Sequence, residues 1–109
     1  MMKCIVAEEV TIRRGESATE NWALIDAAEG SWVWLHLDSF PSPHVVVESA
    51  SPSAQVVAVA AEFCRSGSKY RRLGDLKVCY TTVSNLVKGD APGSVEYRSR
   101  RKVKKLKLK

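Results

Sequence analysis

Three stretches of the chain have the apolar pattern of β-strands, either as short β-prone runs or as positions that alternate between two faces. They are residues 3–14, 32–48 and 76–86. The first stretch predicts a hairpin that closes at Gly15, where a positive φ is easily adopted. One or two further strands are expected over residues 94–109, where Leu106 and Leu108 alternate with lysines.

A short helix is predicted between the first two of these stretches. Ser17 and Glu20, three residues apart, form a capping box, in which side chains satisfy the free amides of a helix N-terminus. Gly30 is expected to end this helix, since glycine commonly follows the last helical residue. The pattern therefore predicts a helix over about residues 18–28.

A longer helix is predicted for residues 54–66, ending near Gly67. Ser49 or Ser51, followed by Pro52, marks its start. Valines, alanines and one phenylalanine leave nearly every side of this helix apolar. We therefore expect it to be buried against the sheet.

These elements predict one α+β domain, with a mainly antiparallel sheet, one buried long helix and one short helix. The chain has 109 residues, of which 45% are hydrophobic, enough for one compact core but too few for two. We expect residues 1–97 to form the core of the domain. Residues 98–109 are expected to continue it as a basic strand or tail.

The stretch 34–48 contains both histidines of the chain, on either side of a proline-containing turn. If residues 39–43 form the loop of a hairpin, Asp38 lies opposite His44, Leu37 opposite Val45 and Leu35 opposite Val47. This register keeps the aliphatic residues on one face. The other face then gathers four residues that no hydrophobic contact explains, namely Trp34, His36, Asp38 and His44.

Several kinds of site would use this group. His36, His44 and Asp38 would supply three ligands to a metal-dependent hydrolase, but the close histidine spacing of a zinc-binding helix is absent. Ser39 or Ser42 beside His44 has the composition of a nucleophilic triad. We favour a stacking surface, because an indole and imidazoles at alternate strand positions present flat faces to unstacked bases. A half-buried aromatic layer with a purely structural role is the remaining alternative.

Positive charge is concentrated at the C-terminal end. Residues 98–109 contain 8 Lys or Arg among 12 residues and no acid, whereas residues 1–97 hold 9 basic and 12 acidic residues, a net of −3. Such a segment either is a solvated tail, protects a sheet edge or follows a phosphate backbone. A basic loop near residue 70 is a second candidate for phosphate contact, through Lys69, Arg71 and Arg72.

Cysteine usage and hydropathy bear on the compartment. The three cysteines have no C-x-x-C spacing and apolar surroundings, so we expect buried, reduced thiols. No apolar run approaches the ~18 residues that a membrane helix needs, and no secretory signal is recognised at the start. We therefore expect an intracellular, cytoplasmic protein without a membrane span.

Short motifs recur in a fixed order from about residue 5 to the end of the chain. They are Glu20-Asn21 with Leu24, Trp34 and His36 followed by His44-Val45, an alanine-rich helix at 54–66, Val78 with Tyr80-Thr81 and Lys88, and Gly93 with Val95 and Tyr97. Together they resemble the NFACT-R family of RNA-binding domains. The segment "YTTVSNLVKG" is most similar to a subgroup of small proteins similar to coiled-coil domain-containing protein 25.

The resemblance implies a nonenzymatic RNA-binding domain linked to the ribosome, tRNA or ribosome-associated quality control. We expect RNA, with tRNA and rRNA as candidates, or another nucleic acid as the ligand, and the ribosome or a protein complex as partner. No cofactor, metal or catalytic residue is expected. A protein-interaction module that docks through the sheet edge or tail is the alternative. The candidate nucleic-acid-binding residues are Trp34, His36, His44, Asn21, Lys69, Arg71, Arg72, Lys88, Arg100, Arg101, Lys104, Lys105 and Lys107.

Overall fold

A computed structural model describes residues 2–108 of the chain. Its strands are β1 (Lys3–Ala7), β2 (Val10–Arg14), β3 (Val33–Leu37), β4 (Val45–Val47), β5 (Lys77–Thr82), β6 (Leu86–Lys88), β7 (Val95–Tyr97) and β8 (Lys104–Lys107). Its helices are α1 (Ala18–Ala27) and α2 (Ala54–Ser66), with 3-10 turns η1 (Val83–Asn85) and η2 (Arg100–Lys102). Within this part of the chain, six strands form a sheet in the order β1-β2-β4-β3-β5-β8, and β6 and β7 form a separate ribbon.

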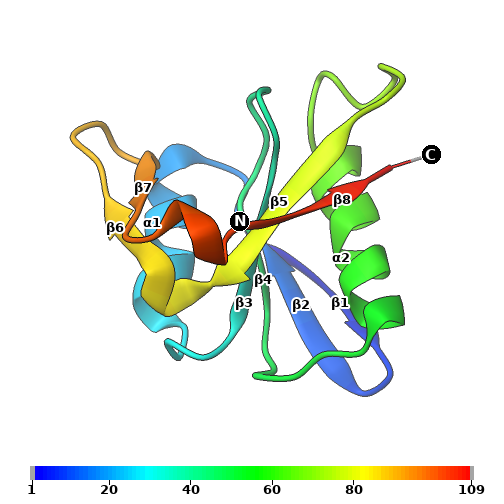
Figure 1. Cartoon of the computed structure of the whole chain (residues 1–109), viewed down its shortest axis with the longest axis horizontal. Helices are drawn as coiled ribbons and strands as arrows, with labels where there is room; N and C mark the ends of the chain where they lie inside the picture. The colour runs from blue at the N-terminus through cyan, green and yellow to red at the C-terminus, as the bar shows by residue number, and fades with distance from the viewer. Residues whose placement is uncertain (1, 109) are drawn as a thin grey trace.

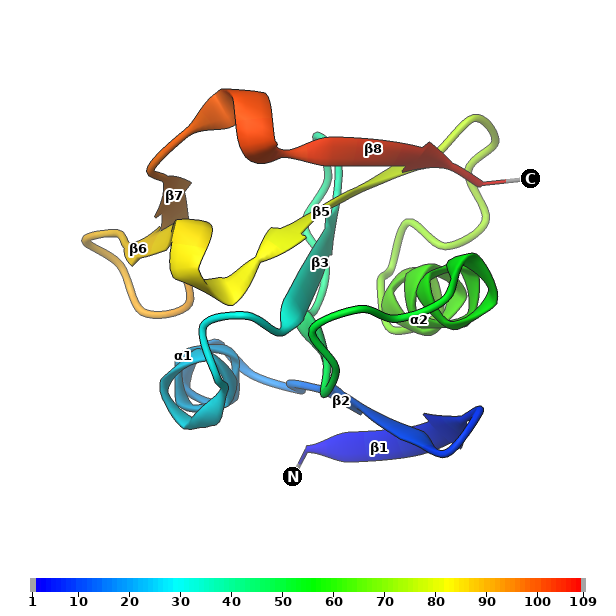
Figure 2. The same cartoon turned by 60° about the horizontal axis from the view of Figure 1, so that its bottom comes forward.

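The predicted α+β class is confirmed. Every strand pair of the six-stranded sheet is antiparallel. The two helices lie on opposite sides of this sheet, with α2 inside its curve and α1 on the other side next to the β6-β7 ribbon (Figures 1 and 2). The sheet therefore has two differently covered faces, which we name the α2 face and the ribbon face.

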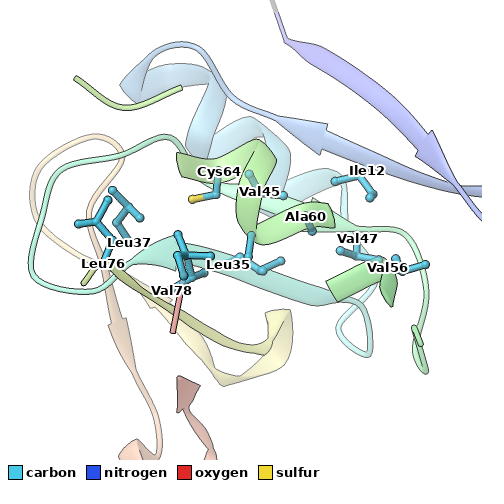
Figure 3. Packing of buried hydrophobic residues seen from close by; sticks show 12 residues of the cluster. Ile12, Leu35, Leu37, Val45, Val47, Val56, Ala60, Cys64, Leu76 and Val78 are labelled. Atoms are coloured by element: carbon cyan, nitrogen blue, oxygen red, sulfur yellow. The ribbon is translucent and has the colours of Figure 1, made fainter. Parts of the chain in front are cut away.

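The α2 face is an aliphatic core. Leu35, Val45 and Val47 are fully buried there and meet Val56 and Ala60 of α2 (Figure 3). Small residues on the helix permit close approach to the strands, and β-branched residues on the strands pack well on a pleated surface. The helix is buried against the sheet as predicted, along the side that holds Val56, Ala60 and Cys64, while Gln55 and Glu62 on its other side are exposed.

Local signals set the ends of both helices. Ser17 caps α1 by accepting a hydrogen bond from the amide of Glu20 at 3.1 Å, as the capping box predicts. The cap of α2 is Ser53, whose hydroxyl accepts from the amide of Val56 at 3.2 Å, rather than Ser49 or Ser51. The cap follows Pro52 directly, so the proline stands just outside the helix.

The first hairpin is confirmed, but its turn lies elsewhere. Glu8 and Glu9 take φ angles of 50° and 65° between β1 and β2, while Gly15 does not have a positive φ. Gly15 is needed for a close approach instead, because a Cβ there would lie 2.2 Å from Oδ1 of Asn21. Cys4 on the edge strand β1 is exposed rather than buried, whereas Cys64 and Cys79 are buried as expected, and all are free thiols.

The second hairpin has a different register from the predicted one. Trp34 pairs with Val46 and Leu35 with Val45, a shift of two residues that lengthens the loop. Ser39 within this loop takes a φ of 69°. Because side chains alternate with a period of two, a shift of two residues preserves the faces, and Leu35, Val45 and Val47 still share one side.

The C-terminal basic segment adds an edge strand to the sheet. Strand β8 pairs with β5, and Leu108 is 5% exposed in the core beneath α2. Lys109, the last residue of the predicted alternation, lies outside the described residues. Among the residues that are described, no helix combines the length and apolar character needed to cross a membrane.

Candidate nucleic-acid interface

A cavity of about 660 Å³ opens on the ribbon face where the ribbon ends. His36 and Asp38 enter it from the end of β3, Tyr97 from β7, and Arg100 and Lys105 from the basic segment. The volume falls within the range of about 300–1,000 Å³ that small-molecule sites occupy. The predicted clustering of Trp34, His36, Asp38 and His44 is thus realised around one cavity.

Trp34 is buried in the structure and does not offer its ring to solvent. Its side chain is 1% exposed, packed among Leu24, Val46, Val83 and Leu86. Since a base stacks only on an accessible ring, the expectation of an exposed indole was wrong. The cover comes from α1 and from residues 83–97, which are far from Trp34 in the sequence.

The indole instead fixes the two histidines. Trp34 Nε1 donates to His44 Nδ1 at 3.1 Å. Since an indole nitrogen only donates, His44 Nδ1 holds a lone pair and the ring proton is on Nε2. His36 Nδ1 lies 2.7 Å from the carbonyl oxygen of Leu37, which only accepts, so His36 carries its proton on Nδ1 and keeps Nε2 as an acceptor. The neutral rings therefore hold opposite tautomers.

Both imidazoles remain neutral near neutral pH. Burial lowers the pKa of His36, and burial together with the neighbouring His36 ring lowers the pKa of His44 to about 3. The ring centroids are 5.2 Å apart in an edge-to-face arrangement. His44 is 3% exposed and neutral, so its imidazole is not placed to act as a charged donor to a phosphate. A second proton on His44 would have to bind Nδ1 and displace the hydrogen bond that this atom accepts from Trp34.

The cavity contains one carboxylate in a polar corner. Asp38 Oδ2 lies 3.2 Å from Lys105 Nζ, and Asp38 Oδ1 accepts from the Cys79 thiol at 3.5 Å. Burial, with Cys79 and Asp38 nearby, raises the pKa of Tyr97 to about 12, so its phenol keeps its proton. Burial and Asp38 likewise raise the pKa of the Cys79 thiol.

Two cationic strand residues continue from this corner along the edge of the sheet. The register pairs Cys79 with Lys105 and Lys77 with Lys107, which puts both β8 lysines on the ribbon face. Lys104 pairs with Tyr80 and therefore belongs to the α2 face. Lys107 is 3.8 Å from Asp75, an exposed ion pair.

The other candidate residues are scattered. Lys69 and Asn21 line a smaller hollow of about 380 Å³ beside the first. Asn21 Oδ1 accepts from the backbone amide of His44 at 3.2 Å, so this residue braces the site. Lys88 is 2.7 Å from Asp26 on the ribbon, and Arg71 bonds to the carbonyl of Ser68 at 3.2 Å. Arg72 and Arg101 are exposed and do not line either hollow.

The residues that the sequence reasoning missed are Tyr97, Cys79 and Lys77. Cys79 and Lys77 alternate along β5, which was a usable signal for a shared face. Cys79 lies opposite His36 through the pairing of β3 with β5, strands that β4 and α2 separate along the chain. Tyr97 enters through the ribbon, whose position no local pattern predicts.

A metal centre has little support in this geometry. Within residues 2–108, no group of three His, Cys, Asp or Glu side chains is arranged to hold a metal ion. Ser42, one member of the alternative triad, accepts from the amide of Leu37 at 3.0 Å and donates to the carbonyl of Pro43. His44 Nδ1 is occupied by the indole, as described above.

Fold and site together define a small α+β domain with a cavity bordered by a cationic sheet edge. No protein-family model matches the chain. Over 73 residues, 65% of the chain, it is 34% identical to the Rqc2 homolog RqcH of Bacillus subtilis, which supports an NFACT-related region in this part of the chain. The chain spans about 13% of the length of that relative.

A solved structure extends the similarity to almost the whole fold. It is the C-terminal part of a fibronectin/fibrinogen-binding protein from Streptococcus suis, with a TM-score of 0.88 and 28% sequence identity. The match covers 98% of this chain and 44% of that one. The arrangement of strands and helices described above is therefore shared with a protein of known structure.

Proposed function

We propose that this chain is a nonenzymatic RNA-binding domain that works in the cytoplasm in association with the ribosome. The observation that carries the proposal is a group of cations at the cavity: Arg100 and Lys105 line it, and Lys107 follows Lys105 on the same face of β8. Lys107 stands directly opposite Lys77, and the exposed carboxylate of Asp75, 3.8 Å from Lys107, is one negative charge beside these two positive ones. A phosphate backbone would supply a further anion.

The similarity to the Rqc2 homolog RqcH supports the ribosomal part of this proposal. The NFACT-R resemblance points in the same direction, since it implies ribosome-associated quality control with tRNA or rRNA as ligand. Because the chain covers a small part of that relative, the activity of the whole relative is not transferred to it. The proposed task is RNA recognition alone.

Salt dependence of RNA binding tests this function. Anisotropy of a labelled single-stranded RNA, measured from 50 to 200 mM salt, is expected to show log K falling with log salt at a slope of about −0.7 for each neutralised phosphate. Contacts from three cations predict a slope of about −2. A flat dependence, or no binding at 50 mM salt, would contradict the proposal.

A protein-binding role is the second candidate, favoured by the other edge of the sheet. Strand β1 ends the strand order, and its Val6 is 67% exposed. An open edge strand can accept an extended segment of a partner. The related Streptococcus suis protein is described as binding fibronectin and fibrinogen. Binding of immobilised fibronectin that changes little with salt and is lost in Val6→Lys would favour this role over RNA binding.

A further inference from the structure

The cavity differs from the cationic edge beside it in the kind of chemistry that it offers. Its interior presents neutral groups, since both imidazoles and the Tyr97 phenol carry no charge near neutral pH. Its charged members are the Asp38 carboxylate and two cations, Arg100 and Lys105. The sum is one positive charge, which matches one phosphodiester of a nucleic acid rather than a polyphosphate.

Asp38 has unused capacity to accept hydrogen bonds. A carboxylate offers about four acceptor positions, and here one oxygen pairs with Lys105 and the other accepts from the Cys79 thiol. A thiol is a weak donor, so replacing it with an N–H donor of a ligand would give Asp38 a stronger hydrogen bond. Lys105 is 54% exposed and is free to turn toward a phosphate at the rim.

The base that suits this acceptor is guanine. Its Watson–Crick edge presents two adjacent donors, N1–H and the 2-amino group, which both oxygens of a carboxylate can accept at once. Adenine and cytosine offer one amino group beside an acceptor nitrogen, and uracil offers one N–H between two carbonyls. His36 adds a further acceptor through Nε2, and the half-buried rings of Phe40 and Tyr97 line the cavity as candidate surfaces for stacking.

We propose that this cavity binds one unpaired guanine nucleotide of a single-stranded RNA, with Asp38 selecting the base and Arg100 and Lys105 holding its phosphate. The inference rests on the RNA-binding function proposed above and names the ligand of the same site. The neutral histidines line the cavity and Lys105 is exposed beside it, so in this proposal the cations hold the phosphate and the base enters the cavity.

The test compares labelled pentanucleotides that differ at the central base. Anisotropy with the full chain is expected to show UUGUU binding about tenfold more tightly than UUUUU, UUAUU and UUCUU, the ratio that one paired set of hydrogen bonds typically provides. Inosine in place of guanine lacks the 2-amino group and should give an intermediate affinity. Equal affinities of all pentanucleotides would overturn the inference and leave RNA binding intact.

Asp38→Asn assigns the selectivity to one residue. The amide keeps the shape but loses one acceptor, so the advantage of UUGUU should fall to about twofold or less. Asp75→Asn is the matched control, because it also removes a carboxylate from beside a β8 lysine but lies outside the cavity, and it should keep the tenfold preference. A preference that survives Asp38→Asn would overturn the role of Asp38.

Failure of the two proposals is distinguishable. Absence of binding to every pentanucleotide at 50 mM salt would overturn RNA binding and the guanine site together, whereas salt-dependent binding without base preference overturns the guanine site alone. The comparison of bases on the unaltered chain needs no variant, so the outcome does not depend on whether Asp38→Asn folds. Unfolding curves for both Asn variants establish which of them can be compared.

Discussion

The two faces of the six-stranded sheet are made by alternate residues of the same strands, yet they differ in what covers them. On the α2 face, Leu35 and Val45 meet one helix that runs along the strands and closes an aliphatic core. On the ribbon face, α1 and the β6-β7 ribbon cover Trp34 and Val46 but leave His36 beside an open cavity. The cover, rather than the strand pattern, therefore decides where the site lies.

The difference also separates two roles within three consecutive residues of β3. Trp34 is enclosed and holds His44, Leu35 points into the core, and His36 reaches the cavity. A site on a strand is held more rigidly than one on a loop, because its neighbours are fixed by the sheet. The comparison predicts that substitutions in β3 change stability, while substitutions at the cationic edge change binding.

Trp34→Ala is expected to have the largest effect. Removing a buried indole costs about 3–5 kcal/mol in the free energy of unfolding, since it leaves a cavity in the cluster and an unpaired acceptor on His44. Urea unfolding followed by circular dichroism measures it. Trp22→Ala is the control, because that indole is only half-buried and should cost less. A loss below about 1 kcal/mol for Trp34→Ala would contradict the structural role of this residue.

Acid should destabilise the domain through the buried His44 of the ribbon face. The pKa of His44 is about 3 in the folded chain and ordinarily about 6.5, so the unfolded chain takes up the proton first. Its stabilising contribution is complete above pH 6.5 and is lost as the pH falls toward 3. Between pH 6 and pH 5, His44 alone should lower the free energy of unfolding by about 1 kcal/mol.

His44→Gln supplies the comparison for this pH dependence. Glutamine does not titrate, so the variant should have a flatter profile of unfolding free energy between pH 6 and pH 5 even if it is less stable overall. Urea midpoints at matched pH values measure both profiles. An unchanged slope in the variant would show that other groups cause the acid sensitivity.

The cationic edge should be separable by face. Lys105→Gln with Lys107→Gln should flatten the salt slope for single-stranded RNA by up to about 1.4 units, because each lysine neutralises one phosphate. Lys104→Gln, in the same strand but on the α2 face, is the matched control and should change the slope much less. A change for Lys104→Gln of half that of the double variant or more would indicate a diffuse basic tail rather than a face.

Lys88→Gln is expected to have the smallest effect. Its exposed ion pair with Asp26 contributes about 0.2–1 kcal/mol at most, and the residue lies outside the cavity. Thermal unfolding and RNA titration should both give values close to those of the unaltered chain. A loss of RNA affinity similar to that of the Lys105 and Lys107 variant would extend the interface onto the ribbon.

The sequence pattern was sufficient to predict the elements and the grouping of side chains on β3. Alternation placed Leu35 apart from Trp34 and His36, and the capping box located the start of α1 at Ser17. The register of the second hairpin was wrong by two residues because the length of the loop after β3 cannot be read from periodicity. The assignment of side chains to the two faces was still correct, because the error was an even number of residues.

The depth of each residue could not be predicted in the same way. Trp34 is buried by Val83 and Leu86, which follow it by about fifty residues and arrive through the pairing of β3 with β5. Tyr97 and Lys105 reach the cavity through a ribbon and an edge strand whose positions depend on the whole sheet. Burial in turn decides that the histidines are neutral.

The most direct test of the account is to map RNA contact onto the two faces by nuclear magnetic resonance. Titration of the isotope-labelled chain with UUGUU should shift the amide signals of residues around the cavity and along β8, including Asp38, Tyr97 and Lys105. Signals of α2, such as those of Ala58 and Glu62, should stay in place. Shifts confined to α2 or to the β1 edge, or none at saturating RNA, would contradict the claim that the ribbon face binds RNA.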